Sequence, residues 1–114
     1  MKFAKSALVV GVLQFALATG AYAQSDFDAI KAAGVIKIGT EGTYAPFTYH
    51  DASGKLTGFD VEIAQEVANR LGVKAEFIES KWDGLIAGVD AKRYDLAVNE
   101  ITITPERQAK YDFS

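Results

Sequence analysis

Apolar and polar positions along the chain form patterns that predict strands separated by helices. Residues 35–39 are rich in β-branched side chains and predict a strand. From Asp60 to Gly72 the apolar positions recur at helical spacing, and a glycine commonly ends a helix. Two acids at its start, Asp60 and Glu62, are predicted to face solvent and to complement the helix dipole. The predicted buried face comprises Ile63, Ala64, Val67, Ala68 and Leu71.

The remaining segments extend this alternation. Residues 73–78 predict a strand, and Ser80 is placed to cap a helix whose apolar positions are Trp82, Leu85, Ile86 and Val89. Residues 94–99 are apolar without clean alternation, which is typical of a strand covered on both faces. Earlier in the chain we expect a short helix over residues 24–34 and two short strands, residues 47–49 and 55–57, around a turn. This order predicts an α/β fold with an open, mainly parallel sheet and flanking helices.

The predicted topology brings three distant stretches to one rim. The carboxyl ends of the predicted strands are followed by residues 39–41, 79–82 and 99–102. Ligands of open α/β sheets bind outside these ends. We therefore expect a small-molecule site there, joined by the helix start just after the third strand.

That helix start carries an arginine in an unusual position. Thr104 predicts an N-cap and Pro105 the first helical residue, so Arg107 stands third, near the positive end of the helix dipole. One interpretation is an anion site, in which free amides and the guanidinium bind a carboxylate. A surface arginine neutralised by Glu106 or Asp112 explains the position equally well. The residues alone leave both interpretations open.

The N-terminal segment has the pattern of a secretory signal peptide. Lys2 and Lys5 precede an apolar run, residues 7–18, and Ala21-Tyr22-Ala23 provides a small-residue cleavage pattern. We expect residues 1–23 to be the signal peptide, with cleavage after Ala23, and residues 24–114 to be the exported domain. The chain has no cysteine, which excludes disulfides and a lipid-anchored mature form.

Composition excludes several functions. The formal net charge is −3 and the basic residues make no patch, which argues against nucleic acid as a partner. The one histidine, His50, lies beside Asp51 in a turn-like stretch and is a poor start for a metal site. There is no nucleophile–base pair, metal cluster or phosphate loop, so we expect no enzyme activity, no cofactor and no metal.

Several sequence blocks together resemble a known family. The run Gly58-Phe59-Asp60-Val61-Glu62-Ile63, with residues 39–47, 81–86 and 102–107, is similar to the bacterial extracellular solute-binding proteins of family 3, which bind polar amino acids. The resemblance covers residues 28–114. It is strongest to the cystine-binding members, through Glu41-Gly42-Thr43-Tyr44, Lys81-Trp82-Asp83-Gly84 and Lys110-Tyr111-Asp112-Phe113-Ser114.

The resemblance implies contacts to the head group of an amino acid. Arg107 stands where the family binds the ligand α-carboxylate, and Thr102 stands at a second carboxylate contact. Asn99 and the backbone of Glu100 stand where the family receives the α-ammonium group. From the sequence alone, Thr102 is equally an ordinary hydroxyl at a strand end.

The resemblance also implies contacts to the ligand side chain. Tyr44 and Trp82 stand where aromatic rings enclose it, and Glu41 stands where some members place an acid. Trp82 also fits the buried face of its predicted helix, so core packing is an equal alternative. Tyr44 precedes Pro46 and could pack over its own loop.

The implied fold is periplasmic binding protein type II-like, represented by a partial first lobe with the second lobe absent. The implied protein is a monomeric periplasmic component of an ABC importer, which binds cystine or a similar polar amino acid and docks on a membrane permease. Because ligand closure needs both lobes, we expect weak or undetectable binding by residues 24–114 alone, and an exposed sheet edge. The alternatives are an enzyme resembling cyclohexadienyl dehydratases, with Glu41 or Glu100 as the acid, and a truncated non-functional product.

Overall fold

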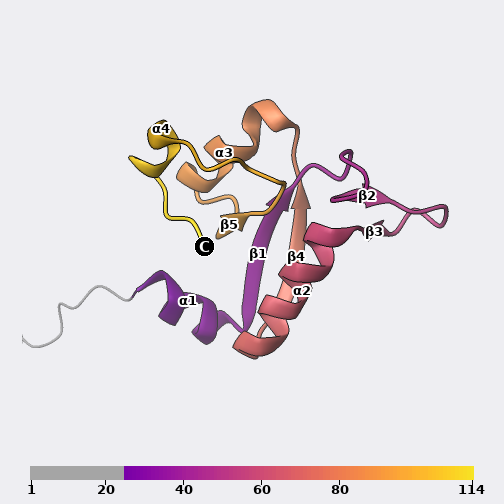
Figure 1. Cartoon of the computed structure of the whole chain (residues 1–114). Helices are drawn as coiled ribbons and strands as arrows, with labels where there is room; N and C mark the ends of the chain where they lie inside the picture. The colour runs from indigo at the N-terminus through magenta and orange to yellow at the C-terminus, as the bar shows by residue number, and fades with distance from the viewer. Residues whose placement is uncertain (1–24) are drawn as a thin grey trace, which may run out of the picture.

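The structure, a computed structural model, describes residues 25–114, and its core is a parallel sheet with helices around it (Figure 1). The predicted signal peptide lies outside these residues. No helix in the described part is long and apolar enough to cross a membrane. The elements are α1 (Asp26–Ala33), β1 (Val35–Thr40), β2 (Tyr49–His50), β3 (Leu56–Thr57), α2 (Phe59–Leu71), β4 (Lys74–Glu79), α3 (Trp82–Asp90), β5 (Leu96–Ala97) and α4 (Pro105–Gln108).

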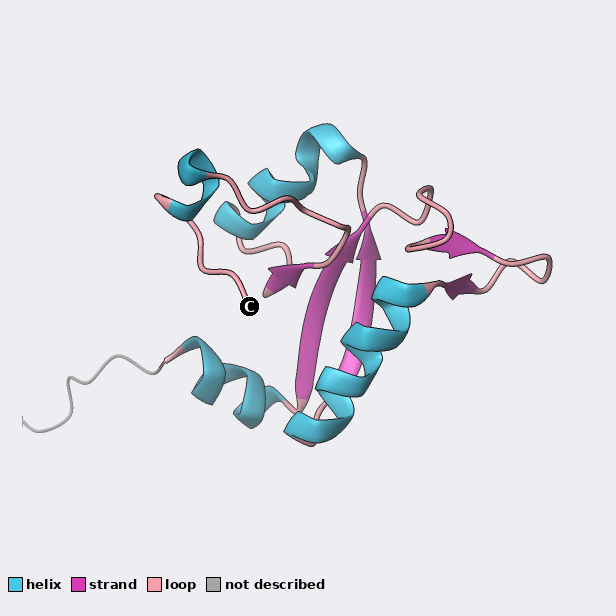
Figure 2. Cartoon of the chain, viewed as in Figure 1, coloured by secondary structure: helices cyan, strands magenta, loops and turns pink. Residues whose placement is uncertain are grey.

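The sheet has the order β4-β1-β5, with both pairs parallel, as predicted. Strands β2 and β3 form a separate antiparallel hairpin that projects to one side of the sheet (Figure 2). The prediction of a strand over residues 94–99 is wrong in extent, because β5 contains only Leu96 and Ala97. The flanking residues have other roles. Tyr94 packs between α3 and β1, and Asn99 lines the site described below.

Glycines end the first two helices, as predicted. Gly34 and Gly72 both have φ 71°, the left-handed conformation that glycine adopts at low cost. The amide of Gly34 donates to the carbonyl of Ile30, and the amide of Gly72 donates to that of Asn69. These caps end α1 just before β1 and α2 just before β4.

The buried face of α2 differs from the predicted one. Ala64 and Ala68 are buried against Ile36 and Ile38 of β1, whereas Ile63 and Val67 are about half exposed. The small alanine side chains let the helix approach the sheet closely, so the larger residues beside them point outward. The apolar positions exposed on α2 are Phe59, Ile63 and Val67.

Asp60 does not face solvent, contrary to the prediction, whereas Glu62 is exposed. Asp60 is only 5% exposed, and its Oδ2 accepts a hydrogen bond of 2.8 Å from the backbone amide of Glu100. The first turn of α2 therefore supports the chain after β5, because a buried carboxylate needs hydrogen-bond donors and finds one there.

Helix α3 begins one residue later than the predicted cap implies. Lys81 occupies the N-cap position without a side-chain hydrogen bond, and the Ser80 hydroxyl lies 3.4 Å from the carbonyl of Lys81, so the prediction of a Ser80 cap is wrong. Leu85 is fully buried, but Trp82 is 42% exposed. The first turn of α3 thus lies beyond the core, and the indole is free to take part in a site.

A tyrosine ring separates α3 from β1. Tyr94 is 2% exposed, and its hydroxyl donates to the carbonyl of Leu85. A Cβ atom at Gly39 of β1 or at Gly88 of α3 would overlap the ring. The two glycines therefore allow the helix to approach the strand to the thickness of one aromatic ring.

Candidate ligand-binding site

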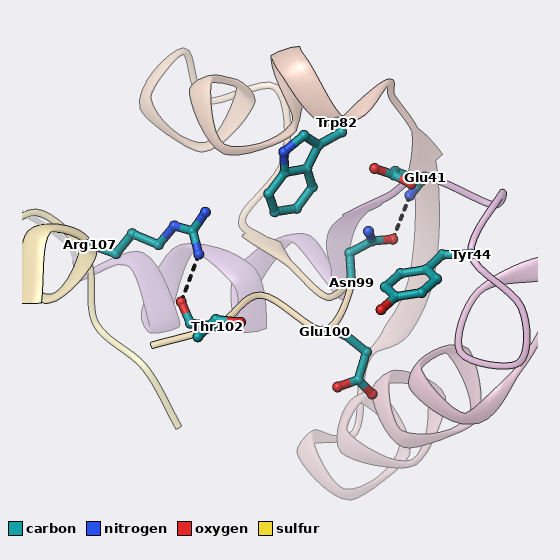
Figure 3. A pocket seen from close by; sticks show the side chains of 7 residues that line it. All are labelled: Glu41, Tyr44, Trp82, Asn99, Glu100, Thr102 and Arg107. Atoms are coloured by element: carbon teal, nitrogen blue, oxygen red, sulfur yellow. Dashed lines mark hydrogen bonds between the residues drawn. The ribbon is translucent and has the colours of Figure 1, made fainter. Parts of the chain in front are cut away.

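A pocket of about 370 Å³ lies at the carboxyl end of the sheet (Figure 3). Its lining comes from the loop after β1, the first turn of α3, the segment between β5 and α4, and α4 itself. The volume falls in the range of small-molecule sites. The lining residues are the seven predicted from the sequence: Glu41, Tyr44, Trp82, Asn99, Glu100, Thr102 and Arg107. Their convergence follows from the parallel topology, which brings the strand ends together.

Arg107 supplies the positive charge of the pocket. Its Nη1 donates to the carbonyl of Thr102 at 2.9 Å, and its Cζ lies 5.6 Å from the ring centroid of Trp82. Neither Glu106 nor Asp112 pairs with it, since the ion pairs within residues 25–114 are Glu66–Arg70 and His50–Glu79. The surface-neutralisation alternative is therefore not realised here, and the guanidinium keeps donors for an anion.

The predicted contribution of free helix amides is smaller than expected. Thr104 caps α4 as predicted, but its hydroxyl accepts the amide of Arg107 at 3.2 Å, and α4 has only four residues. So short a helix gives little dipole, and one of its free amides is already bound. A carboxylate here would be held chiefly by the Arg107 side chain.

Two aromatic rings line the pocket. Tyr44 is 44% exposed and packs edge-on against Phe47, with ring centroids 5.1 Å apart. Both alternatives for Tyr44 therefore hold at once, because the ring packs over its loop and still lines the pocket. For Trp82 the core-packing alternative is wrong, since the indole is exposed and lies beside the Arg107 guanidinium.

A buried network of hydrogen bonds forms the floor beneath one side of the pocket. Asn99 is 2% exposed, and its Oδ1 accepts from the Thr40 hydroxyl at 3.1 Å and from the Glu41 amide at 3.0 Å. The Thr40 hydroxyl also lies 2.8 Å from that of Thr48, which accepts the Gly42 amide at 3.0 Å. Both lone-pair directions of the Asn99 side-chain carbonyl are thus used to hold the loop.

Sequence reasoning missed the two threonines of this floor. Thr40 and Thr48 are 1% and 0% exposed, yet each has the appearance of an ordinary β-branched strand residue. The available signal was weak: a hydroxyl at each end of a short loop. Only the folded chain shows that they share one network with Asn99.

Glu100 has an unusual backbone and a perturbed side chain. Its φ is 53°, in the left-handed region that costs a residue with a Cβ roughly 1–2 kcal/mol. The hydrogen bond to Asp60 holds the Glu100 amide in this conformation. A side-chain hydrogen bond with Asp60 raises the pKa of the Glu100 carboxyl, and desolvation and the charge of Asp60 act in the same direction.

The distribution of charge suits a zwitterion. Arg107 lies on one side, and Glu41 and Glu100 lie across the pocket from it (Figure 3). The Glu41 carboxylate lies 3.4 Å from the Thr43 hydroxyl, which orients it only weakly. No group of three metal-ligating side chains occurs in residues 25–114. The arrangement therefore offers separate contacts for a carboxylate and an ammonium group.

Residues 36–114 match the bacterial extracellular solute-binding proteins, family 3. The chain belongs to this family. It is 51% identical over 106 residues to a probable amino-acid ABC transporter-binding protein of Haemophilus influenzae, covering 87% of this chain and 41% of that protein. It is 45% identical over 111 residues to the L-cystine-binding protein TcyJ of Escherichia coli, covering 93% of this chain and 42% of that protein. The chain thus spans about two fifths of these curated relatives.

Solved structures support the assignment to this family. The unliganded L-cystine solute receptor of Neisseria gonorrhoeae is 54% identical, with a TM-score of 0.70 over 75% of this chain and 37% of that one. An ancestral cyclohexadienyl dehydratase is 44% identical, with a TM-score of 0.76 over 82% of this chain and 39% of that one. The arginine-bound domain 1 of TmArgBP is 38% identical, with a TM-score of 0.70 over 72% of this chain and 65% of that one. The fold is a partial periplasmic binding protein type II domain, as the sequence predicted.

Proposed function

We propose that this chain is the first-lobe part of the substrate-binding component of an ABC amino-acid importer, and that it binds cystine or a similar polar amino acid. The observation that carries the proposal is the pocket itself, where Arg107, with Trp82 beside it, faces Glu41, Glu100 and Tyr44 across a space of amino-acid size. The names of the relatives, which include cystine- and histidine-binding proteins, support this ligand class.

In the proposed complex, the Arg107 guanidinium pairs with the ligand α-carboxylate, assisted by Thr102. The α-ammonium group lies across the pocket, toward the backbone carbonyls of Asn99 and Glu100, because the Asn99 side-chain carbonyl already has two donors. Tyr44 and Trp82 enclose the ligand side chain, and Glu41 contacts its polar end.

We also propose export to the periplasm by residues 1–23, with cleavage after Ala23, and transfer of the ligand to a membrane permease by a monomeric receptor. The leader pattern and the periplasmic relatives support this location. Intact-mass analysis of the exported product tests the cleavage site, because retention of residues 1–23 would contradict it.

The ligand proposal is tested by titrating the ¹⁵N-labelled chain with L-cystine and, separately, with cystamine, which has the same disulfide and amines but no carboxylates. We expect cystine to shift the Trp82 indole and the amides near Asn99, and cystamine to bind far more weakly. The expected affinity is low for a chain of this length. The arginine-bound structure of an isolated domain 1 in a relative supports measurable binding by such a unit.

Arg107→Ala should reduce cystine binding to the level of cystamine, a loss of about 1.5 to 3 kcal/mol, because a charged hydrogen-bonding partner is removed. The matched control is Arg70→Ala, which removes an exposed arginine paired with Glu66 on α2. Equal affinity of wild type and Arg107→Ala for cystine would remove Arg107 from the site.

An enzyme on this fold is the second candidate. The similarity to an ancestral cyclohexadienyl dehydratase favours it, and Glu100, whose carboxyl has its pKa raised by the hydrogen bond with Asp60, is the candidate general acid. Incubation with prephenate or arogenate distinguishes the two candidates. Product formation that is lost in Glu100→Gln would replace the transport proposal, and its absence alongside cystine binding would support transport.

A further inference from the structure

His50, which the binding proposal does not use, lies between the pocket loop and the end of β4. Its Nδ1 lies 3.1 Å from the carbonyl oxygen of Gly42, and its Nε2 lies 2.9 Å from Oε1 of Glu79. The ring thus joins the hairpin to two other segments, the loop after β1 and the carboxyl end of β4.

Both partners of the ring are hydrogen-bond acceptors. A backbone carbonyl and a carboxylate can only accept hydrogen bonds, whereas a neutral imidazole has a single N–H. If only Nδ1 carried a proton, the Nε2 lone pair would face the Glu79 carboxylate. If only Nε2 carried one, the Nδ1 lone pair would face the Gly42 carbonyl. Both contacts are favourable together only when His50 is an imidazolium ion.

The surroundings leave Glu79 as the charged group that contacts the ring. From its own hairpin, Asp51 is held within the turn, where Oδ1 accepts from the amide and hydroxyl of Ser53 and from the amide of Lys55, and it makes no ion pair with the ring in the described residues. Across the hairpin, the register partner of His50 is the apolar Leu56. From the loop after β1, the contact is the backbone of Gly42.

This contact bears directly on the pocket because Gly42 lies between two of its lining residues, Glu41 and Tyr44. Gly42 has φ 75°, and a Cβ atom there would overlap the Glu79 carboxylate, so the loop lies tightly against the pair. The Tyr44 amide donates to the carbonyl of Thr48 at 2.6 Å, which connects the loop to the strand that carries His50.

We infer that His50 and Glu79 are positioning residues, which hold the loop carrying Glu41 and Tyr44 in place through a contact that is complete only when the ring is doubly protonated. Histidine is the side chain that changes charge between about pH 5 and 8. The loop is therefore held most firmly at the acidic end of that range and less firmly as the ring loses a proton. The consequence for ligand affinity rests on the proposed function, but the contact itself does not.

The contact is tested without ligand by NMR. In the full ¹⁵N-labelled chain, the His50 ring nitrogens and the amides of Gly42, Thr43 and Tyr44 are followed from pH 5 to 8. We expect the three amides to titrate together with the ring. Glu79→Ala should uncouple them, whereas the control Glu76→Ala, which removes the same charge from an exposed position of the same strand, should not. His50→Leu should abolish the amide titration.

Three outcomes overturn the inference: amides that do not move with the ring, an equal effect of both glutamate variants, or a neutral ring at a pH where the amides have not changed. A second arm measures the dissociation constant for L-cystine over the same pH range. Wild type should bind more weakly at pH 8 by up to about fivefold beyond the weakening caused by deprotonation of the ligand ammonium group, the size expected of a half-exposed ion pair, and Glu79→Ala should keep only the ligand's contribution. If residues 24–114 bind no cystine at any pH, as is expected when a single lobe binds undetectably, the ring titration still decides whether the contact exists.

Discussion

The two sides of the pocket are built in different ways. On the β1 side, the loop with Glu41 and Tyr44 rests on hydrogen bonds among residues that are almost fully buried, including Thr48 and Asn99. On the α4 side, Arg107 is held by one carbonyl, one indole ring and a helix of four residues. The first side is an extension of the folded core, and the second depends on local contacts at the surface.

This difference indicates how each side responds to change. Bonds inside the core open only when much of the fold opens, whereas short surface elements open locally at low free energy. The β1 side should therefore report on global stability, and the α4 side should move without affecting it. Ligand entry is expected to reorder the α4 side more than the β1 side.

The largest effect is expected for Asn99→Leu. This change keeps the approximate volume but removes the oxygen that accepts from Thr40 and Glu41. The part-buried Glu41 amide then lacks its acceptor and the buried Thr40 hydroxyl keeps only Thr48, which should lower the free energy of unfolding by about 1 to 3 kcal/mol. Urea denaturation followed by circular dichroism measures the loss. The control is Asn69→Leu, at an exposed position of α2. Similar losses of unfolding free energy in both variants would show that the buried network adds no stability of its own.

A smaller and local effect is expected for Thr104→Ala. Removing the N-cap hydroxyl should destabilise α4 by about 1 kcal/mol, because the Arg107 amide loses its acceptor. Hydrogen exchange of the α4 amides should become faster while the urea midpoint of the whole chain stays constant. Thr104→Ser keeps the cap and should behave as wild type. A lowered global midpoint in Thr104→Ala would mean that the two sides of the pocket are equally coupled to the core.

The smallest effect concerns pH and the segment after α4. The Tyr111 hydroxyl donates to Oδ2 of Asp90 at 2.6 Å, and this hydrogen bond is the main reason that the pKa of Tyr111 is raised. A raised pKa means that the fold favours the neutral phenol. The contact is therefore intact below the usual tyrosine range and is lost as pH rises through the raised value. Ultraviolet titration should show that Tyr111→Phe reduces the late-ionising absorbance by the amount of one tyrosine; a late phase of unchanged size in Tyr111→Phe would contradict the assignment.

The sequence predicted most of the architecture because its local signals agreed with the global fold. Gly34 and Gly72 end helices where the left-handed conformation is required, and the apolar strands are parallel as the alternation with helices implies. The errors arose where a tertiary contact overrode a local rule. Asp60 resembled a dipole-complementing acid at a helix start, but its true partner is an amide 40 positions later.

The residues that line the candidate site could be predicted, but the contacts that hold them in place could not. Parallel strand ends converge by topology, so the lining could be predicted from the sequence and the resemblance. The hydrogen bonds of Thr48 and the ring contacts of His50 join segments whose relative placement no local pattern specifies. Such contacts become visible only once the loop between β1 and β2 has its three-dimensional course.

The ring of Tyr94 packs between Gly39 and Gly88, and this contact sets how closely α3 approaches the sheet. Gly88 lies six residues, or about 9 Å of helix axis, from the indole of Trp82. A side chain added at Gly88 would overlap the Tyr94 ring, so either the ring or α3 must shift. We expect that a shift of α3 would also move Trp82, which stands in its first turn and lines the pocket, so a glycine outside the pocket affects the position of a group inside it.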